Sequence, residues 1–133
     1  MIPKLRAWDI ENHCMRIVSS INFTHKVIYC MIAELSPFDL GNEISLDDVV
    51  LMQSTGLKDK NGIEIYEGDV IHYKHSFRNP MTGSGMLTLD RNFKIIFEDG
   101  EFKANGFDMR LKKMISNSEV IGNIYTNPDL LKS

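Results

Sequence analysis

The sequence predicts a mainly β protein of the α+β class. A small mixed N-terminal lobe, residues 1–48, precedes an SH3-like β-barrel, residues 49–133, that ends in a short helical turn. Short apolar and β-branched runs alternate with glycine-containing turns from residue 49 onward, which is typical of small barrels. The 133 residues, 43% of them hydrophobic, suffice for one domain or for a compact domain with an appended lobe.

The N-terminal lobe begins with a predicted hairpin. Residues 4–9 (KLRAWD) alternate apolar and polar side chains and indicate a strand, and the polar residues 11–13 supply a turn. Residues 14–23 (CMRIVSSINF) are rich in β-branched side chains and indicate a returning strand, bent near Ser19-Ser20.

The rest of this lobe is less regular. Residues 27–35 form an apolar run that fits a buried strand or a short buried helix, and its β-branched start favours the strand. Ser36-Pro37 ends the run, because the residue before proline disfavours the helical region. A loop follows at 38–43. Ser45 is a predicted N-cap for one helical turn at 46–48, where the two acidic residues lie near its positive end.

The stretch LMQSTGLKDKNGIEIYEGDVI, residues 51–71, carries the densest turn chemistry. Asn61-Gly62 tolerates positive φ and predicts a tight turn, and the Asp59 carboxylate can bond the backbone two residues on. Ile63 and Ile65 share a parity, which predicts a common face of a strand. Residues 67–69 predict a second tight turn that leads into a strand at 70–73.

Further strands and turns follow in the second half of the chain. Residues 76–85, with Asn79-Pro80 and three small residues near the end, are expected to form a long mobile loop. The remaining expected elements are strands at 86–89 and 93–97, a hairpin turn at 98–100, a return strand at 101–104, a turn at 105–106, a strand or loop at 107–115, a last strand at 120–125, and a helical turn at 127–131 capped by Asn127.

Charge and cysteine content exclude several classes of protein. The net charge is −3, so no global field attracts nucleic acid. The acidic excess lies within residues 1–50. Cys14 and Cys30 are too few for a secreted disulfide scaffold of this size, and we expect both to be reduced and buried. No basic-then-apolar leader and no apolar run near about 18 residues occur, which predicts a soluble, cytoplasmic protein without a membrane segment.

Three blocks of the sequence together resemble a known family. They are LMQxTGLKDKNGxEIYEGDV at residues 51–70, EVIGNIYxNPxLL at residues 119–131, and RAWD at residues 6–9. In this order they resemble the YopX family of phage and prophage proteins. The resemblance implies a mixed α/β N-terminal part, an SH3-like β-barrel and a phage or prophage origin within a bacterial host. It implies no reaction, so it brings no catalytic residues and no cofactor.

No cluster in the sequence rises to a catalytic or metal-binding site. Glu67 and Asp69 flank a glycine and are better explained as turn residues than as an acid–base pair. His72 and His75 would point to opposite faces of a strand and cannot share a metal without a bend. His13 adjoins Cys14, but neighbours on a strand point apart, so neither cysteine is a strong candidate nucleophile. We therefore predict no catalytic, cofactor or metal site.

One basic strip is a candidate nucleic-acid contact. Arg110, Lys112 and Lys113, with Lys103 and Arg91, lie near several phenylalanines in the sequence, and basic plus aromatic residues on a small barrel can bind single strands. The competing interpretation places the phenylalanines in the core and the lysines in solvent. It is favoured because residues 51–133 carry no net positive charge.

Three functional hypotheses follow. The favoured one is a non-enzymatic phage accessory protein that self-associates or contacts a phage or host protein, since many strand edges need covering. The alternative is a nucleic-acid-binding module in phage replication or transcription. The third is a hydrolase that would bring together Asp69, a histidine and Cys14 or Cys30, and it is not expected.

Overall fold

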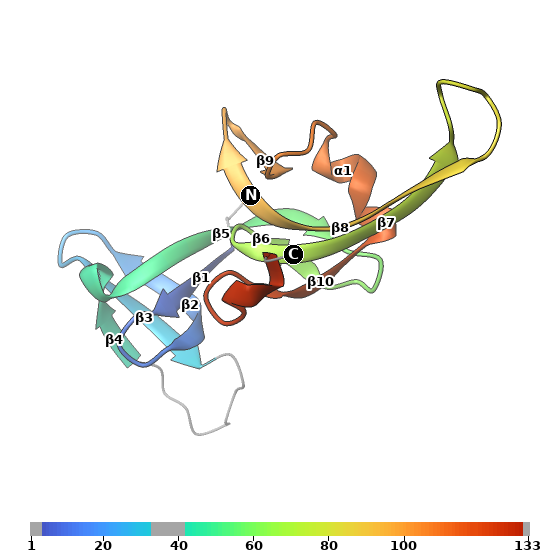
Figure 1. Cartoon of the computed structure of the whole chain (residues 1–133). Helices are drawn as coiled ribbons and strands as arrows, with labels where there is room; N and C mark the ends of the chain where they lie inside the picture. The colour runs from blue at the N-terminus through green and yellow to red at the C-terminus, as the bar shows by residue number, and fades with distance from the viewer. Residues whose placement is uncertain (1–3, 33–41, 132–133) are drawn as a thin grey trace. The chain divides into compact units, whose positions relative to one another are not determined.

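The computed structural model describes residues 4–32 and 42–131 and shows a mainly β chain (Figure 1). It folds as two compact units, Met1–Ser54 and Thr55–Ser133. Ten strands are described: β1 (Leu5–Asp9), β2 (Cys14–Asn22), β3 (Val27–Ile32), β4 (Asn42–Ser45), β5 (Val49–Lys58), β6 (Glu64–Tyr66), β7 (Asp69–Arg78), β8 (Met86–Glu98), β9 (Glu101–Ala104) and β10 (Ser118–Asn123). The helical elements are α1 (Leu111–Met114) and 3-10 turns at Leu46–Asp48, Ile115–Asn117 and Pro128–Leu131.

The N-terminal unit is an antiparallel sheet. Strands β4, β3, β2 and β1 follow one another in space, and β1 pairs with β5 from Leu5↔Gln53 to Asp9↔Val49. The predicted hairpin of residues 4–23 is confirmed. Its predicted bend appears as a register shift between Val18 and Ser20.

The remaining expectations for the N-terminal unit concern the apolar run, the loop after it and the helical turn. Val27–Ile32 is a strand, so the strand alternative for the apolar run is correct. The expected end of the apolar run at Ser36-Pro37 and most of the loop at 38–43 lie outside the described residues. That loop was expected to reach residue 43, but strand β4 begins at Asn42 and pairs with β3. The helical turn at Leu46–Asp48 is confirmed, with Ser45 Oγ accepting a hydrogen bond from the Asp47 N–H.

The C-terminal unit holds a four-stranded antiparallel sheet in the order β10-β7-β8-β9. Its core packs the buried side chains of β6, β7 and β8 against Ala104 and the apolar face of α1. The largest members are Ile65, Ile71, Tyr73, Phe93, Ile95, Leu111 and Met114. Strand β6 belongs to a different sheet, in which it follows β5. Neither described sheet closes on itself, so the predicted SH3-like barrel is not confirmed.

The 51–71 stretch folds largely as its turn chemistry predicts. Asp59 Oδ1 accepts hydrogen bonds from the N–H groups of Asn61 (2.8 Å) and Ile63 (2.9 Å), and Gly62 has a φ of +82°. The prediction that Ile63 and Ile65 share a face is wrong: Ile65 is fully buried, while Ile63 precedes β6 and is 53% exposed. The Ile63 N–H donates to the Asp59 carboxylate within the turn, so Ile63 is not part of the strand.

Two predictions for the second half of the chain are also wrong in part. The predicted strands at 86–89 and 93–97 are both strand, but they form one continuous strand, β8. The expected mobile loop at 76–85 is wrong at residues 76–78, which continue β7. Strands β7 and β8 form one long ribbon, paired from Val70↔Lys94 to Arg78↔Met86, and only residues 79–85 turn. The expected strand or loop at 107–115 contains α1 instead, because Leu111 and Met114 lie three residues apart and both bury in the core.

Candidate functional site

An open groove of about 930 Å³ lies in the C-terminal unit. Thr55 and Leu57 of β5 line it, together with β9, the segment 105–110 and the start of α1. Glu98 and Glu101 contribute from the turn between β8 and β9. The groove therefore lies between β5 of the six-stranded sheet and β9 of the four-stranded sheet.

Strand β9 gives the groove a strand edge. It is the last strand of the four-stranded sheet and pairs with β8 on one side. Within residues 4–32 and 42–131, its other edge carries a single bridge, between Lys103 and Arg110. An edge with so little pairing presents backbone donors and acceptors that a further strand can use.

The groove carries charges of both signs. Lys103 Nζ donates to Glu98 Oε1 at 3.2 Å, and this contact raises the pKa of Lys103. Among the described residues, the other charged side chains of the groove form no ion pair: they are Glu101, Asp108, Arg110 and Lys112. Two acids and two bases thus remain available to a charged partner.

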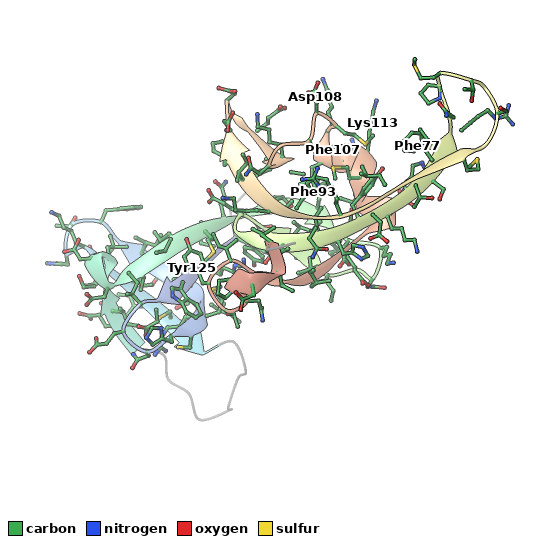
Figure 2. The ribbon with its side chains drawn as sticks, viewed as in Figure 1. Phe77, Phe93, Phe107, Asp108, Lys113 and Tyr125 are labelled. Carbon is green, nitrogen blue, oxygen red and sulfur yellow. The ribbon has the colours of Figure 1, made fainter. Side chains whose placement is uncertain are left out.

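The predicted basic strip is divided by the structure. Arg110 and Lys112 line the groove beside the acidic residues, whereas Lys113 is exposed on α1 and does not line it. Figure 2 shows Asp108 and Lys113 on the segment that leads from β9 into α1. Arg91 lies over the ring of Phe93, with its guanidinium carbon 5.2 Å from the ring centre. A nucleic-acid contact at this strip stays a prediction, and two of its basic residues lie beside acidic side chains of the groove.

The phenylalanines near this strip divide between core and surface. Phe93 is buried and its ring centre lies 5.0 Å from that of Phe107. Phe97 is 49% exposed and packs on Phe102 at 4.8 Å between ring centres. Core packing therefore accounts for the first pair, while the second pair lies on the hairpin that borders the groove.

The other candidate residues occupy structural positions. Asp69 is 2% exposed, and its Oδ2 accepts the N–H of Tyr66 at 2.7 Å, which closes the turn around Gly68. His72 contacts Asp90, whereas His75 stacks on Phe77, so the two histidines lie on opposite faces of β7 as predicted. Within the described part of the chain, no three histidine, cysteine or acidic side chains gather in a metal-binding group.

The cysteines are free thiols in different surroundings. Cys30 is fully buried, and burial raises the pKa of its thiol, which disfavours the nucleophilic thiolate. Cys14 is half-buried rather than buried, so the expectation of burial is right for Cys30 and wrong for Cys14.

Two buried carboxylates hold loops in place. Burial alone would raise the pKa of Asp9, but hydrogen bonds from Asn12 and Arg16 outweigh it and hold that pKa at about 2. Burial likewise acts on Asp59, yet three backbone N–H donors, including Val120 at 2.8 Å, lower its pKa below the ordinary value. These carboxylates act as structural acceptors.

The chain is a mainly β protein of two compact units, with an open groove of mixed charge in the C-terminal unit. The comparisons identify its family. Residues 4–132 match the model of the YopX protein family, and the chain belongs to this family, as the resemblance of its three sequence blocks predicts.

One solved structure is similar over nearly its whole length. This is the crystal structure of protein EF1440 from Enterococcus faecalis, at 30% sequence identity and a TM-score of 0.67, with 99% of each chain covered. No curated protein matches the chain. No helix in the described residues is long and apolar enough to cross a membrane.

Proposed function

We propose that this protein is a non-enzymatic accessory protein of a phage or prophage, and that it works in the host cytoplasm by self-association through the groove of its C-terminal unit. The observation that carries the proposal is the little-paired edge of β9 beside that groove. An edge of this kind gains hydrogen bonds and loses exposure when another chain covers it.

The charges of the groove support a second copy as the occupant. In a two-fold dimer the same surface meets itself, so each charged group must find its complement on an identical surface. Glu101 and Asp108, set beside Arg110 and Lys112, supply two charges of each sign within one groove. A two-fold arrangement can place acid against base in both directions, which favours association and fixes its register.

Light scattering over a wide range of protein concentration tests the self-association. We expect a mass above that of the 15.2 kDa chain. A monomer at every concentration would contradict the proposal. The charge-reversal variant Glu101→Lys should return the protein to monomer, while Glu11→Lys, an exposed acid of the other unit, should leave the mass unchanged.

Site-specific photo-crosslinking tests the location. A benzophenone side chain at Asn105, which is exposed and lines the groove, should give a covalent dimer on illumination. The same group at Glu11 should not. A cross-link from Asn105 to a different phage or host protein, with no dimer, would replace self-association by a heterologous contact at this groove.

A further inference from the structure

The outer half of the β7–β8 ribbon is an arm that projects from the C-terminal unit. We define the arm as residues 74–90. It comprises five cross-strand pairs, from Lys74↔Asp90 to Arg78↔Met86, and the connecting turn. Figure 1 shows it as a long curved ribbon that extends beyond α1. At roughly 3.3 Å per residue its paired part is about 15 Å long.

The arm has two different faces. Alternation along the strands gives one face a mainly apolar and aromatic character, with His75, Phe77, Leu87 and Leu89. The His75 ring stacks on Phe77, and Phe77 and Leu87 are 40% and 41% exposed. The opposite face is mainly polar, with Lys74, Ser76, Arg78, Thr88 and Asp90, and it also carries the exposed Met86. Ser76 and Thr88 share a hydrogen bond of 2.8 Å across the strands, which ties the ribbon together.

The arm is basic although the whole chain has a net charge of −3. No acidic residue occurs between Lys74 and Leu89, whereas Lys74 and Arg78 are both exposed in this segment. Asp90, at the base of the arm, receives a hydrogen bond from His72, and Arg91 follows it. Asp90 lies opposite Lys74 across the strands and partly offsets its charge, whereas the cross-strand partner of Arg78 is the uncharged Met86.

The tip of the arm is ordered and exposes an apolar pair. Asn79 organises it, because its Oδ1 accepts the Met81 N–H (2.9 Å) and its carbonyl accepts the Gly83 N–H (2.9 Å). A further bond from the Asn79 N–H to the Gly85 carbonyl closes the turn at 3.2 Å. Met81 is 90% exposed, and Pro80 beside it is exposed as well. The proline and methionine of this hydrogen-bonded turn are exposed and therefore contribute little to the packing of the unit.

We propose that the arm binds duplex DNA, with Lys74 and Arg78 contacting phosphates and with Pro80 and Met81 inserted as a wedge at a base step. Proteins that bind the minor groove commonly insert apolar wedges, proline and methionine among them, and so partly unstack and bend the duplex. The basic residues of the arm supply the charge complementarity that any phosphate backbone requires.

The dimensions require that binding and bending occur together. Paired strands lie about 4.8 Å apart before side chains are added. Such a ribbon is too wide for a minor groove of about 6 Å in undistorted B-DNA. Unstacking by the wedge opens the minor groove and admits the arm. The exposed apolar face of the arm then contacts the sugars that form the groove walls.

The chemistry of the arm predicts structural rather than sequence selectivity. Its side chains offer few groups that could read base edges, and phosphate contacts carry no sequence information. The unstacking cost is smallest where the duplex is already interrupted. We therefore expect tighter binding to a nicked or mismatched duplex than to an intact one of the same sequence.

Fluorescence anisotropy with labelled intact, nicked and single-stranded DNA tests the arm at several salt concentrations. The double variant Lys74→Gln/Arg78→Gln should bind duplex about tenfold more weakly or worse, with a salt slope reduced by about 2, one for each phosphate contact. The matched variant Lys26→Gln/Lys58→Gln removes the same charge at two exposed positions outside the arm and the groove, and it should bind as the unaltered protein does. Equal losses in the two variants, or no binding at low ionic strength, would overturn the proposal.

A second measurement addresses the wedge. Energy transfer between dyes at the two ends of the duplex should report bending. Pro80→Ala/Met81→Ser should abolish the bending and also weaken duplex binding, because the arm enters only a groove that the wedge has opened. Unchanged bending would overturn the wedge. Tighter binding of single-stranded than of duplex DNA would replace it by stacking on the aromatic face. If the arm variants instead alter the oligomeric mass and leave DNA binding unchanged, the arm is a protein contact.

Discussion

The inner and outer halves of the β7–β8 ribbon have the same secondary structure and opposite surroundings. In the inner half Ile71, Tyr73, Phe93 and Ile95 are at most 2% exposed, because the core of the C-terminal unit packs on them. In the outer half nearly every side chain from Lys74 to Thr88 is exposed. Figure 2 shows the contrast, with Phe93 beside Phe107 in the body and Phe77 out on the arm.

This difference separates stability from function within one pair of strands. Apolar burial in the inner half contributes to folding, whereas the outer half buries little and gains little from it. A ribbon maintained so far beyond its core, with an exposed apolar face, is typical of an interaction surface. The predictions below test this division, from the largest expected effect to the smallest.

Two phenylalanines provide the strongest test. Phe93→Ala removes a buried ring that contacts Phe107 and Tyr73, and we expect a loss of about 3–5 kcal/mol in the free energy of unfolding. Phe77→Ala, on the arm, should cost less than about 1 kcal/mol. Urea unfolding of both variants gives the comparison. Equal losses would mean that the arm is as important for stability as the core.

The short turns of the molecule could be predicted from the sequence further than the outer half of the ribbon. Turns whose chemistry is local were read correctly: Asp59 with Asn61-Gly62, the Ser45 cap, and the hairpin at Asp99-Gly100, where both residues have positive φ. Each depends on atoms a few residues apart. The hydrogen bond from Val120 to Asp59 could not be read in this way, because it joins residues 61 positions apart.

The arm could not be predicted because the turn at 79–85 is long and lacks the two-residue signature of a tight hairpin. Asn79-Pro80 and the small residues that follow it favour a loop, and they outweighed the alternation of Tyr73, His75 and Phe77. Leu87 and Leu89 alternate in the same way in the following segment. Together these two patterns are the sequence signal for a continued ribbon. The groove had no such signal, because it is lined by residues of β5 together with residues of β9 and α1, which lie far from β5 in the sequence.

The second test compares a polar anchor of the body with one of the arm. Asp59→Asn places an amide where a carboxylate accepts three N–H groups, so at least one buried donor loses its acceptor, at a cost of about 2 kcal/mol. Ser76→Ala removes the exposed bond to Thr88 and should cost less than about 0.5 kcal/mol. Chemical unfolding measures both. A cost for Ser76→Ala as large as that for Asp59→Asn would contradict the division.

The same anchor should appear in the pH dependence of stability. The folded pKa of Asp59 lies below its ordinary value, so the folded state binds fewer protons in acid than the unfolded state does. Its contribution is therefore complete above about pH 4 and is lost as the pH falls through the folded pKa. Asp59→Asn should flatten this part of the stability profile, measured by thermal unfolding from neutral to acidic pH. An unchanged profile would show that other carboxylates cause the acid sensitivity.

Shortening the arm tests whether the body folds without it. Replacing residues 76–88 by Asn-Gly joins His75 to Leu89, which are paired across the ribbon, through a favoured two-residue turn. Because little apolar surface is buried there, we expect the unfolding free energy to change by less than about 1 kcal/mol. DNA binding, in contrast, should be lost. A shortened protein that unfolds far more easily would show that the arm is part of the folding unit.

The smallest effect concerns the polar contact at the boundary between the two halves. His72 lies on β7 just before the arm and hydrogen-bonds Asp90. This contact lowers the pKa of the Asp90 carboxyl below its ordinary value. In His72→Gln the pKa of Asp90 should therefore rise, as followed by NMR titration of the carboxyl carbon. A carboxyl whose pKa is lowered on folding stabilises the folded state at pH values above its ordinary pKa, and this contribution is lost as the pH falls through the folded pKa. Asp90 is exposed, however, so solvent screens its interaction with His72. The thermal midpoint at neutral pH should accordingly stay the same, and a clear drop would mean that the base of the arm contributes to the stability of the body.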